Sequence, residues 1–271
     1  MNWMIYGANG YTGELIAREA ARRGLKPIVA GRRAEPIERL ANELGLQARV
    51  FSLDTPAEVD GGLDNVALVL HCAGPFSTTA IPMIEGCLLA GVHYLDITGE
   101  IPVFEYAHST DVSRRARESD VIICPGVGFD VVPTDCLALK LKELLPDATG
   151  LSLGFETRSG LSRGTAQTVI EGLAEGCLVR RNGVIHPVPM GSLRRKIDFG
   201  RGPRSAMAIP WGDVSTAYYT TSIPNVDTWV PMPTVLAWGA RLLDISRPLL
   251  SSNWVQGKLK NLVKRYIKGP N

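Results

Sequence analysis

The chain has 271 residues, of which 45% are hydrophobic and 21% charged, and its formal net charge is +2. These values fit a globular protein of one large domain or two smaller ones, and they argue against a broad basic face for nucleic acid. Its five cysteines are scattered without a C-x-x-C pair, which argues against a metal site or a disulfide framework and indicates a cytoplasmic location.

The first 33 residues carry the pattern on which the functional interpretation depends. An apolar strand is predicted at 3–6, a helix from the following turn to Gly24, and a second strand at 27–30. Because the first strand begins so close to the N-terminus, no signal peptide is expected. The turn between the first strand and the helix consists of Gly7, Ala8, Asn9, Gly10, Tyr11, Thr12 and Gly13. Strand, glycine turn, helix and strand in this order are typical of a dinucleotide-binding unit.

The three glycines of this turn have separate expected roles. Gly7 lets the chain turn sharply off the strand, Gly10 leaves room for a pyrophosphate, and Gly13 lets the helix lie close to the sheet. The helix N-terminus then offers free N–H groups and partial positive charge to the phosphates. The glycine spacing is one residue longer at the front than the standard fingerprint. A purely structural turn is the alternative interpretation.

The residues at the end of the second strand indicate which dinucleotide is bound. Where NAD-binding versions usually carry an acidic residue, this chain has Gly31, followed by Arg32 and Arg33. Guanidinium groups suit a 2′-phosphate, which a carboxylate repels. The sequence therefore predicts NADP(H) in preference to NAD(H). The alternative is that both arginines are solvated charges ahead of the next helix.

Strand and helix patterns continue to alternate through the first half of the chain. Strands are predicted at 48–51, 66–72, 94–97 and 121–124, and helices at 35–44, 80–90 and 101–118. The strands at 66–72 and 121–124 are almost continuously apolar, which is typical of buried parallel strands. We predict an α/β fold in which residues 1–132 form a Rossmann-like, doubly wound parallel sheet.

The pattern changes after Pro133. A helix is predicted at 134–145, a strand at 151–157, a helix at 165–175, and a hairpin in which 178–181 meets 184–185 across Asn182 and Gly183. Residues 133–271 are therefore predicted to form a second, α+β domain for substrate binding or dimerisation.

The sequence pattern of the C-terminal part of this second domain is compatible with more than one kind of contact. A basic amphipathic helix is predicted at 258–268. The apolar region 229–255 is interrupted by charged residues and prolines, so a transmembrane helix is not expected. Contact with a second copy of the chain and peripheral contact with a membrane both stay open for this region.

Ligands of an open parallel sheet bind beyond the carboxyl ends of its strands. Four predicted loops meet there, at 7–13, 72–79, 96–100 and 125–135. Cofactor contacts are expected from Asp54 after the third strand and from four residues after the fourth, namely Cys72, Ala73, Gly74 and Pro75. The small residues of this last group would let the backbone approach the nicotinamide end of the cofactor.

A nicotinamide cofactor carries the hydride, so the protein must manage one proton. The candidates near the strand ends are Tyr94, Asp96, Glu100, Asp130 and Asp135, with Cys72 and Cys124 as weaker ones. Tyr94 and Asp130 are the preferred general acids. Both have structural alternatives, since an aspartate after glycine often caps a turn. Asp135 is better explained by the first turn of a helix, and no Ser-Lys-Tyr arrangement is visible.

Seven stretches together resemble the saccharopine dehydrogenase-like oxidoreductases, most closely the branch that includes the trans-acting enoyl reductases. They are residues 6–13, 30–33, 72–76, 94–100, 125–135, 162–165 and 209–213. The resemblance implies an N-terminal NADP-binding domain that uses the three turn glycines and the two arginines. It also implies a C-terminal α+β domain that closes over the cofactor.

The resemblance carries two further expectations. Some members of the branch reduce a carbon–carbon double bond in a lipid or polyketide chain held by a synthase. Relatives usually continue past a position like Gly269-Pro270, whereas this sequence stops at Asn271. The second domain is therefore expected to lack part of the family's structure.

Three functional hypotheses remain at this level. The first is an NADP(H)-dependent reductase of an apolar acyl, enoyl or carbonyl substrate, supported by Trp211, Trp229, Trp238 and Trp254. The second is an amino-acid dehydrogenase of the saccharopine kind, which would need convergent arginines from Arg158, Arg163, Arg201 and Arg204. The third is a cofactor-binding scaffold that docks through 229–255 without turnover. The first is preferred.

Overall fold

The computed structural model describes residues 2–156 and 176–245. The chain separates into two compact units, Met1–Val132 and Pro133–Asn271. The predicted helices at 165–175 and 258–268 lie outside the described residues, as do Arg158, Arg163, Trp254, the motif at 162–165 and the chain end.

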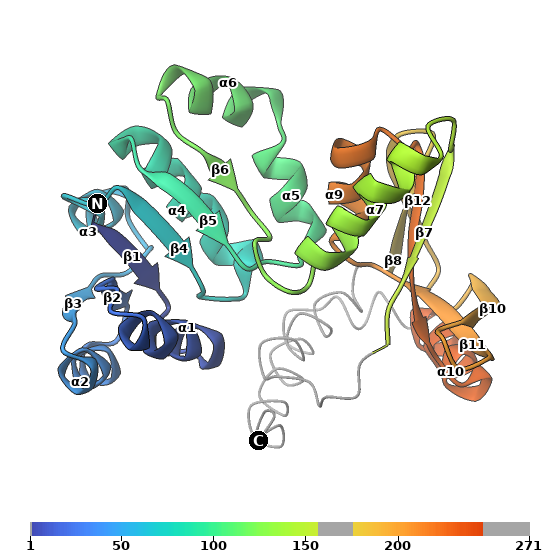
Figure 1. The fold of residues 1–271 in the computed structure, drawn as a ribbon, viewed down its shortest axis with the longest axis horizontal. Helices are drawn as coiled ribbons and strands as arrows, with labels where there is room; N and C mark the ends of the chain where they lie inside the picture. Colours follow the sequence, from blue (N-terminus) through green and yellow to red (C-terminus); the bar gives the residue numbers. More distant parts are fainter. Residues whose placement is uncertain (1, 157–175, 246–271) are drawn as a thin grey trace. The chain divides into compact units, whose positions relative to one another are not determined.

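The N-terminal unit is built on a six-stranded sheet with the order β3-β2-β1-β4-β5-β6, in which all neighbouring strands are parallel (Figure 1). The strands are β1 (Trp3–Tyr6), β2 (Ile28–Gly31), β3 (Gln47–Val50), β4 (Leu68–His71), β5 (His93–Asp96) and β6 (Ile123–Cys124). This order confirms the predicted doubly wound sheet. The direction of winding reverses between β1 and β4, so the carboxyl ends of these two strands flank the switch point where ligands bind.

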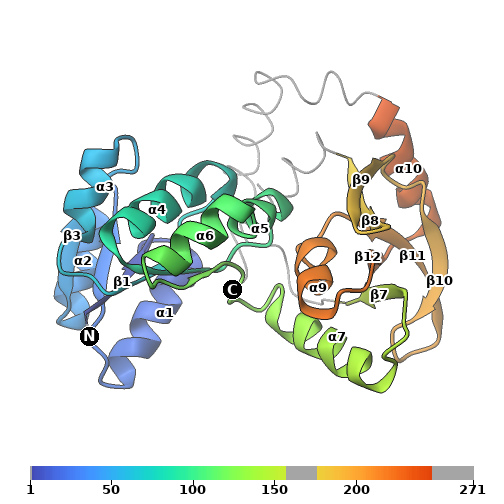
Figure 2. The same ribbon diagram turned by 90° about the horizontal axis from the view of Figure 1, so that it is seen from above.

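Helices cover both faces of this sheet (Figure 2). They are α1 (Tyr11–Arg22), α2 (Ala34–Leu44), α3 (Pro56–Leu63), α4 (Phe76–Ala90), α5 (Ile101–Ala107) and α6 (Thr110–Glu118). Successive strand residues point to opposite faces. Ile5 accordingly packs with Ala17 of α1 and Ile37 of α2, whereas Met4 belongs to the cluster of α3 and α4.

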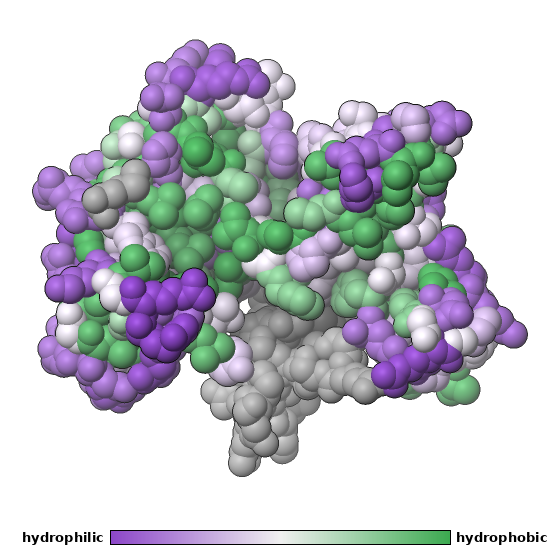
Figure 3. Space-filling model, in the orientation of Figure 1, coloured by the Kyte–Doolittle hydropathy of each residue, from purple (hydrophilic) through white to green (hydrophobic). Residues whose placement is uncertain are grey.

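The two faces of the sheet are not equally covered. On the face opposite α4, the side chains of Leu68, Leu70 and Leu95 are only half-buried, because α1 and α2 pack against β1 to β3. Figure 3 shows hydrophobic residues over β4 and β5, and hydrophilic residues over α6. The exposed side of α6 is charged, with Arg114 paired to Asp111 and to Glu118.

Two helices of this unit differ from the sequence-based prediction. The helix predicted at 101–118 is two helices, because the first ends at His108 and Ser109 begins the second, its hydroxyl accepting from the Val112 N–H at 3.4 Å. Helix α3 was not predicted, since its sequence contains two glycines. One of them, Gly62, is required by packing, because a Cβ there would lie 2.4 Å from the Phe51 ring.

The C-terminal unit contains a second sheet, with the order β10-β11-β12-β8-β9, and β7 pairs with β12 as well. The strands are β7 (Gly150–Gly154), β8 (Cys177–Arg181), β9 (Val184–Val188), β10 (Arg194–Asp198), β11 (Pro203–Ile209) and β12 (Asn225–Pro231). All its pairs are antiparallel except β7 with β12. The predicted hairpin is confirmed: β8 and β9 are joined at Asn182 and Gly183, which both have positive φ.

Three described helices pack against this second sheet, which confirms the α+β class. They are α7 (Val132–Leu144), α9 (Asp213–Thr221) and α10 (Thr234–Ile245). Ala138 of α7 and Ala217 of α9 share one cluster, and Ala237 of α10 belongs to another with Trp229. Trp229 is thus a core residue, whereas Trp238 is 54% exposed. Within the described ranges, no helix combines the length and apolarity needed to cross a bilayer.

Candidate cofactor site

The glycine turn is shaped by close backbone contacts. Gly7 has a φ of +82°, and its N–H and that of Ala8 donate to the Ala30 carbonyl of β2, at 2.8 and 3.1 Å. A Cβ on Gly7 would lie 2.7 Å from the backbone nitrogen of Ala73. A Cβ on Gly13 would lie 2.4 Å from the Gly7 carbonyl oxygen. Both positions therefore exclude a side chain, and α1 begins directly against the turn.

The N-terminus of α1 has the features of an anion site. Gly10 precedes the helix and provides no capping side chain. The first helical hydrogen bond runs from the Glu14 N–H to the Gly10 carbonyl, at 2.9 Å. The N–H groups of Tyr11, Thr12 and Gly13 lie before this first bond and therefore have no acceptor within the helix. These groups, with the helix dipole, suit the pyrophosphate of a dinucleotide.

The loop after β4 lies against this turn. The Cys72 N–H donates to the Tyr6 carbonyl at 2.7 Å, and Ala73 contacts Gly7. The Thr79 hydroxyl lies 2.6 Å from the Ala73 carbonyl oxygen, which fixes the loop to the first turn of α4. A Cβ on Gly74 would meet nothing closer than 3.7 Å, so packing does not require glycine there.

His71, the last residue of β4, contacts this loop through Thr79. Its Nε2 lies 3.0 Å from the Thr79 hydroxyl, which already donates to a carbonyl, so the ring nitrogen is the donor. The ring is fully buried and stacks on Tyr6 at 5.4 Å between centroids. Burial lowers the pKa of His71 to about 3, so the ring stays neutral near pH 7. The sequence alone does not reveal this role, because a histidine in an apolar strand resembles a core residue.

Glu100, in the loop after β5, also fixes the loop after β4. Its carboxylate oxygens accept from the Phe76 N–H at 2.9 Å and the Ser77 N–H at 2.6 Å, at the start of α4. Pro75, which precedes the helix, provides no capping side chain. The Glu100 side chain is buried, with 8% exposure. This geometry assigns Glu100 to the capping of α4, where a carboxylate also meets the positive end of the helix dipole.

Asp96 connects the loops after β5 and β6. Its carboxylate accepts from the Tyr94 hydroxyl at 2.7 Å, the Thr98 N–H at 2.9 Å and the Gly126 N–H at 2.7 Å. Asp96 is fully buried, and burial raises its pKa to about 6 against the lowering effect of these hydrogen bonds. The carboxyl edge of the sheet is thus organised by two buried acids, Asp96 and Glu100.

Tyr94 and Asp130, the two preferred general acids, lie in different surroundings. Tyr94 has no exposed surface, and burial raises the pKa of its hydroxyl well above the usual range. Because that hydroxyl is held by Asp96, the geometry favours a positioning role for Tyr94. Asp130 is partly exposed, and burial raises its pKa too. Its Oδ2 lies 3.5 Å from the position of a Cβ on Gly99, which places Asp130 beside the loop after β5.

The other proton-handling candidates have structural or unreactive surroundings. Asp135 belongs to the C-terminal unit, where it accepts from the Thr220 hydroxyl at 2.6 Å. Burial raises the pKa of Cys72 to about 12, and it also raises the pKa of Cys124. Neither thiol is poised to ionise near neutral pH.

The residues expected at the adenosine end lie around the ends of β1 and β2. A Cβ on Gly31 would lie 3.0 Å from Asn9 Oδ1, so this side chain of the turn reaches the end of β2. Arg32 is exposed, and its charge acts on the Tyr6 hydroxyl together with that of Asp54. Arg33 is also exposed and directly precedes α2. Arg32 follows β2 directly, and Arg33 lies at the start of α2.

The comparisons with known proteins agree with this geometry. Residues 3–123 match the family model described as the saccharopine dehydrogenase NADP binding domain. The human saccharopine dehydrogenase-like oxidoreductase is 29% identical over 153 residues, which cover 49% of this chain and 35% of that protein. A trans-acting enoyl reductase of Mycobacterium bovis is 28% identical over 156 residues, which cover 54% of this chain and 37% of that protein.

One solved structure extends the likeness to the fold of both units. Apo saccharopine dehydrogenase (L-Glu forming) from Saccharomyces cerevisiae has a TM-score of 0.64 and 12% sequence identity, covering 93% of this chain and 59% of that one. The sequence matches to the two curated relatives span little more than a third of their length. Residues 3–123, just under half of this chain, match the model of the NADP-binding domain of the saccharopine dehydrogenase family.

Proposed function

We propose that the protein is an NADP(H)-dependent reductase that acts on an enoyl or carbonyl group of an apolar acyl substrate. The observation that carries the proposal is the contact between the glycine turn and the loop after β4. There, Gly7 and Ala73 meet so closely that a Cβ on the glycine is excluded. This contact lies at the switch point of the sheet, where a dinucleotide binds.

Binding requires three groups of this chain to act together. The N–H groups at the start of α1 are assigned to the pyrophosphate, and Arg32 and Arg33 to the 2′-phosphate. The loop at 72–75 is assigned to the nicotinamide end, because Thr79 and Glu100 hold it in place. When bound, NADPH supplies the hydride.

Reduction of an enoyl or carbonyl group also needs one proton, and we assign its donation to the Asp130 carboxyl. Asp130 combines partial exposure with a raised pKa, which keeps more of its carboxyl protonated towards neutral pH. Similarity to the trans-acting enoyl reductase of Mycobacterium bovis supports the enoyl substrate class. A saccharopine-type substrate is less well supported, since Arg204, one of the arginines it would need, is paired with Glu156.

The proposal is tested by absorbance at 340 nm in two parallel assays. One follows NADPH oxidation with an enoyl thioester, and the other follows NADPH formation from NADP⁺ with saccharopine. We expect turnover with the thioester alone. Asp130→Asn is expected to lower kcat by about 10²-fold or more while leaving NADPH binding intact. Turnover with saccharopine alone would establish the amino-acid dehydrogenase instead. NADPH binding without turnover of either substrate would favour a scaffold that docks on a membrane or a second copy of the chain.

A further inference from the structure

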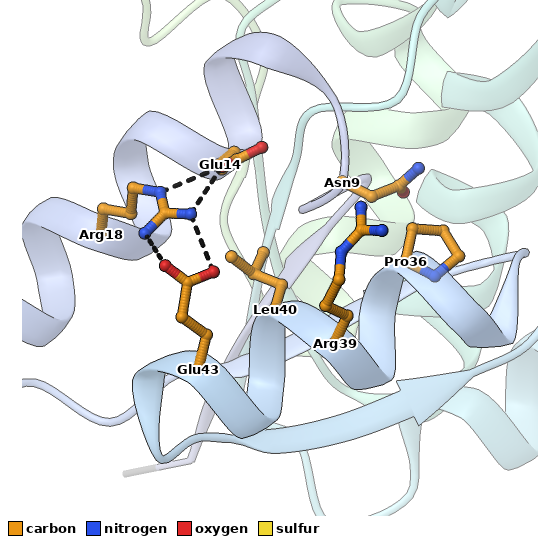
Figure 4. A pocket seen from close by; sticks show the side chains of 7 residues that line it. All are labelled: Asn9, Glu14, Arg18, Pro36, Arg39, Leu40 and Glu43. Atoms are coloured by element: carbon orange, nitrogen blue, oxygen red, sulfur yellow. Dashed lines mark hydrogen bonds and ion pairs between the residues drawn. The ribbon is translucent and has the colours of Figure 1, made fainter.

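A pocket of about 250 Å³ lies between α1 and α2, beside the glycine turn (Figure 4). It is lined by Asn9, Glu14, Arg18, Pro36, Arg39, Leu40 and Glu43. Asn9 is the link to the cofactor site, because its Oδ1 also lies 3.0 Å from the position of a Cβ on Gly31. The pocket therefore adjoins the end of β2, where the 2′-phosphate of NADPH is expected.

The charged residues of this pocket are not equivalent. Arg18 is held by both of its acids, at 2.8 Å from Glu14 and 2.6 Å from Glu43, and further hydrogen bonds join the same groups. Figure 4 shows the Arg18 guanidinium between these two carboxylates. The hydrogen bond from Arg18 also lowers the pKa of Glu43. Both acids of the pocket are thus engaged by one arginine.

Arg39 is the second cation of the pocket, and its carboxylate contact is much looser. The salt bridge recorded for it within the described residues joins Nη1 to Glu35 at 4.0 Å, beyond hydrogen-bond distance. Its side chain is 73% exposed, and the guanidinium points towards Asn9 (Figure 4). Its donors are therefore available to an anion that enters beside the glycine turn.

We propose that Arg39 contacts the 2′-phosphate of NADPH from the pocket side and is a determinant of the preference for NADPH over NADH. The inference rests on the proposed cofactor site and adds a residue on α2 to Arg32 and Arg33. A phosphate at this position meets guanidinium groups from the end of β2 and from the second turn of α2, together with the N-terminus of α2. Arg18 pairs with both acids of the pocket, whereas the ion pair recorded for Arg39 joins it to Glu35.

Arg39→Ala tests this assignment, with Arg22→Ala as the matched control. Arg22 is 70% exposed, pairs with Glu19 on α1 and does not line the pocket, so the control removes the same charge at similar exposure. Affinities for NADPH and NADH are measured by calorimetry, and those for 2′,5′-ADP and 5′-AMP separate the 2′-phosphate from the rest of the cofactor.

Arg39→Ala is expected to lower the affinities for NADPH and 2′,5′-ADP about tenfold. This is the effect expected when one charge-assisted hydrogen bond is lost at a partly exposed site. NADH and 5′-AMP are expected to change less than about twofold, Arg22→Ala to change none of the four, and Arg39→Lys to recover part of the loss. Thermal unfolding should show that all variants fold.

Two results with Arg39→Ala would overturn the inference, as would a third with the wild-type protein. If Arg39→Ala weakened the binding of NADPH and NADH equally, Arg39 would have a structural role. If NADPH binding were unchanged, Arg39 would be a solvated surface charge without contact to the cofactor. Failure of the wild-type protein to bind either coenzyme would remove the cofactor site itself and the inference with it. The wild-type titration therefore distinguishes a failure of the proposed function from a failure at Arg39.

Discussion

At the scale of single residues, the site is governed by buried titratable groups whose effects on stability oppose one another. The folded-state pKa of Asp96, about 6, lies above its ordinary value of 3.8, so the folded protein holds this proton more tightly than the unfolded chain. Its contribution to stability is therefore greatest below pH 4 and is lost as the pH rises through 6. His71 has the opposite sign. Its pKa falls from 6.5 to about 3, and its contribution is lost as the pH falls through that range.

Asp96→Asn separates these two effects. The difference in unfolding free energy, wild type minus variant, is expected to fall by about 2 kcal/mol between pH 4 and pH 7, because only the wild type has the titrating carboxyl. Any constant cost of replacing the side chain does not alter this slope. Urea unfolding at several pH values measures it. A difference that stays constant across this range would show that Asp96 ionises normally in the folded protein.

Glu100 gives a second prediction at this scale. Its carboxylate accepts two N–H groups at the start of α4. Removal of that cap is expected to cost about 2 kcal/mol in Glu100→Ala, and less in Glu100→Gln, which keeps one acceptor. NADPH affinity should fall as well, since the loop at 72–75 leads into this helix. The control is Glu38→Gln at an exposed position of α2. Equal stability of Glu100→Ala and the control would exclude the capping role.

At the scale of elements, the packing of α1 on the glycine turn sets the position of the proposed phosphate site. A Cβ on Gly13 would meet the Gly7 carbonyl oxygen at 2.4 Å, a contact with backbone that no rotamer can relieve. Gly13→Ala is therefore expected to displace α1, to lower the affinity for NADPH by at least about tenfold and to lower the Tm.

Gly61→Ala is the matched control for Gly13→Ala. Gly61 lies within α3, and a Cβ there meets nothing within 4 Å. The substitution is expected to stabilise the protein by about 0.5–1 kcal/mol, because it restricts the unfolded chain and suits a helix. Calorimetric titration and thermal unfolding of both variants measure these effects. Intact NADPH binding by Gly13→Ala would contradict the described position of α1.

The same scale shows which elements are predictable from sequence. Most strands of the first sheet are predictable because they are short apolar runs that end in turn residues. The β8–β9 hairpin is predictable because Asn182 and Gly183 favour positive φ. Strand β10 was missed, since Arg194, Arg195 and Lys196 are consecutive, exposed charges without an apolar alternation. This strand forms because it pairs with β11, and its own residue pattern does not indicate a strand.

At the scale of the whole molecule, the strand order and the family match support the predicted cofactor site more directly than they support the proposed reaction. The switch point between β1 and β4 follows from the sheet order, and residues 3–123 match an NADP-binding domain. The loops at 7–13 and 72–79 lie at this switch point, as expected from the sequence, and their cofactor contacts stay a prediction. The sequence does not separate structural from reactive acids, because Glu100 accepts from N–H groups 23 and 24 residues away and Asp96 from one 30 residues away.

The central claim is that NADPH binds against the N-terminus of α1, with its 2′-phosphate held by arginines. Calorimetric titration of the wild type and of Arg32→Asp with NADPH and NADH tests it most directly. We expect the wild type to prefer NADPH, and we expect Arg32→Asp to lose far more affinity for NADPH than for NADH, because a carboxylate repels the extra phosphate. Equal losses for the two coenzymes, or no binding of either by the folded wild type, would contradict the account.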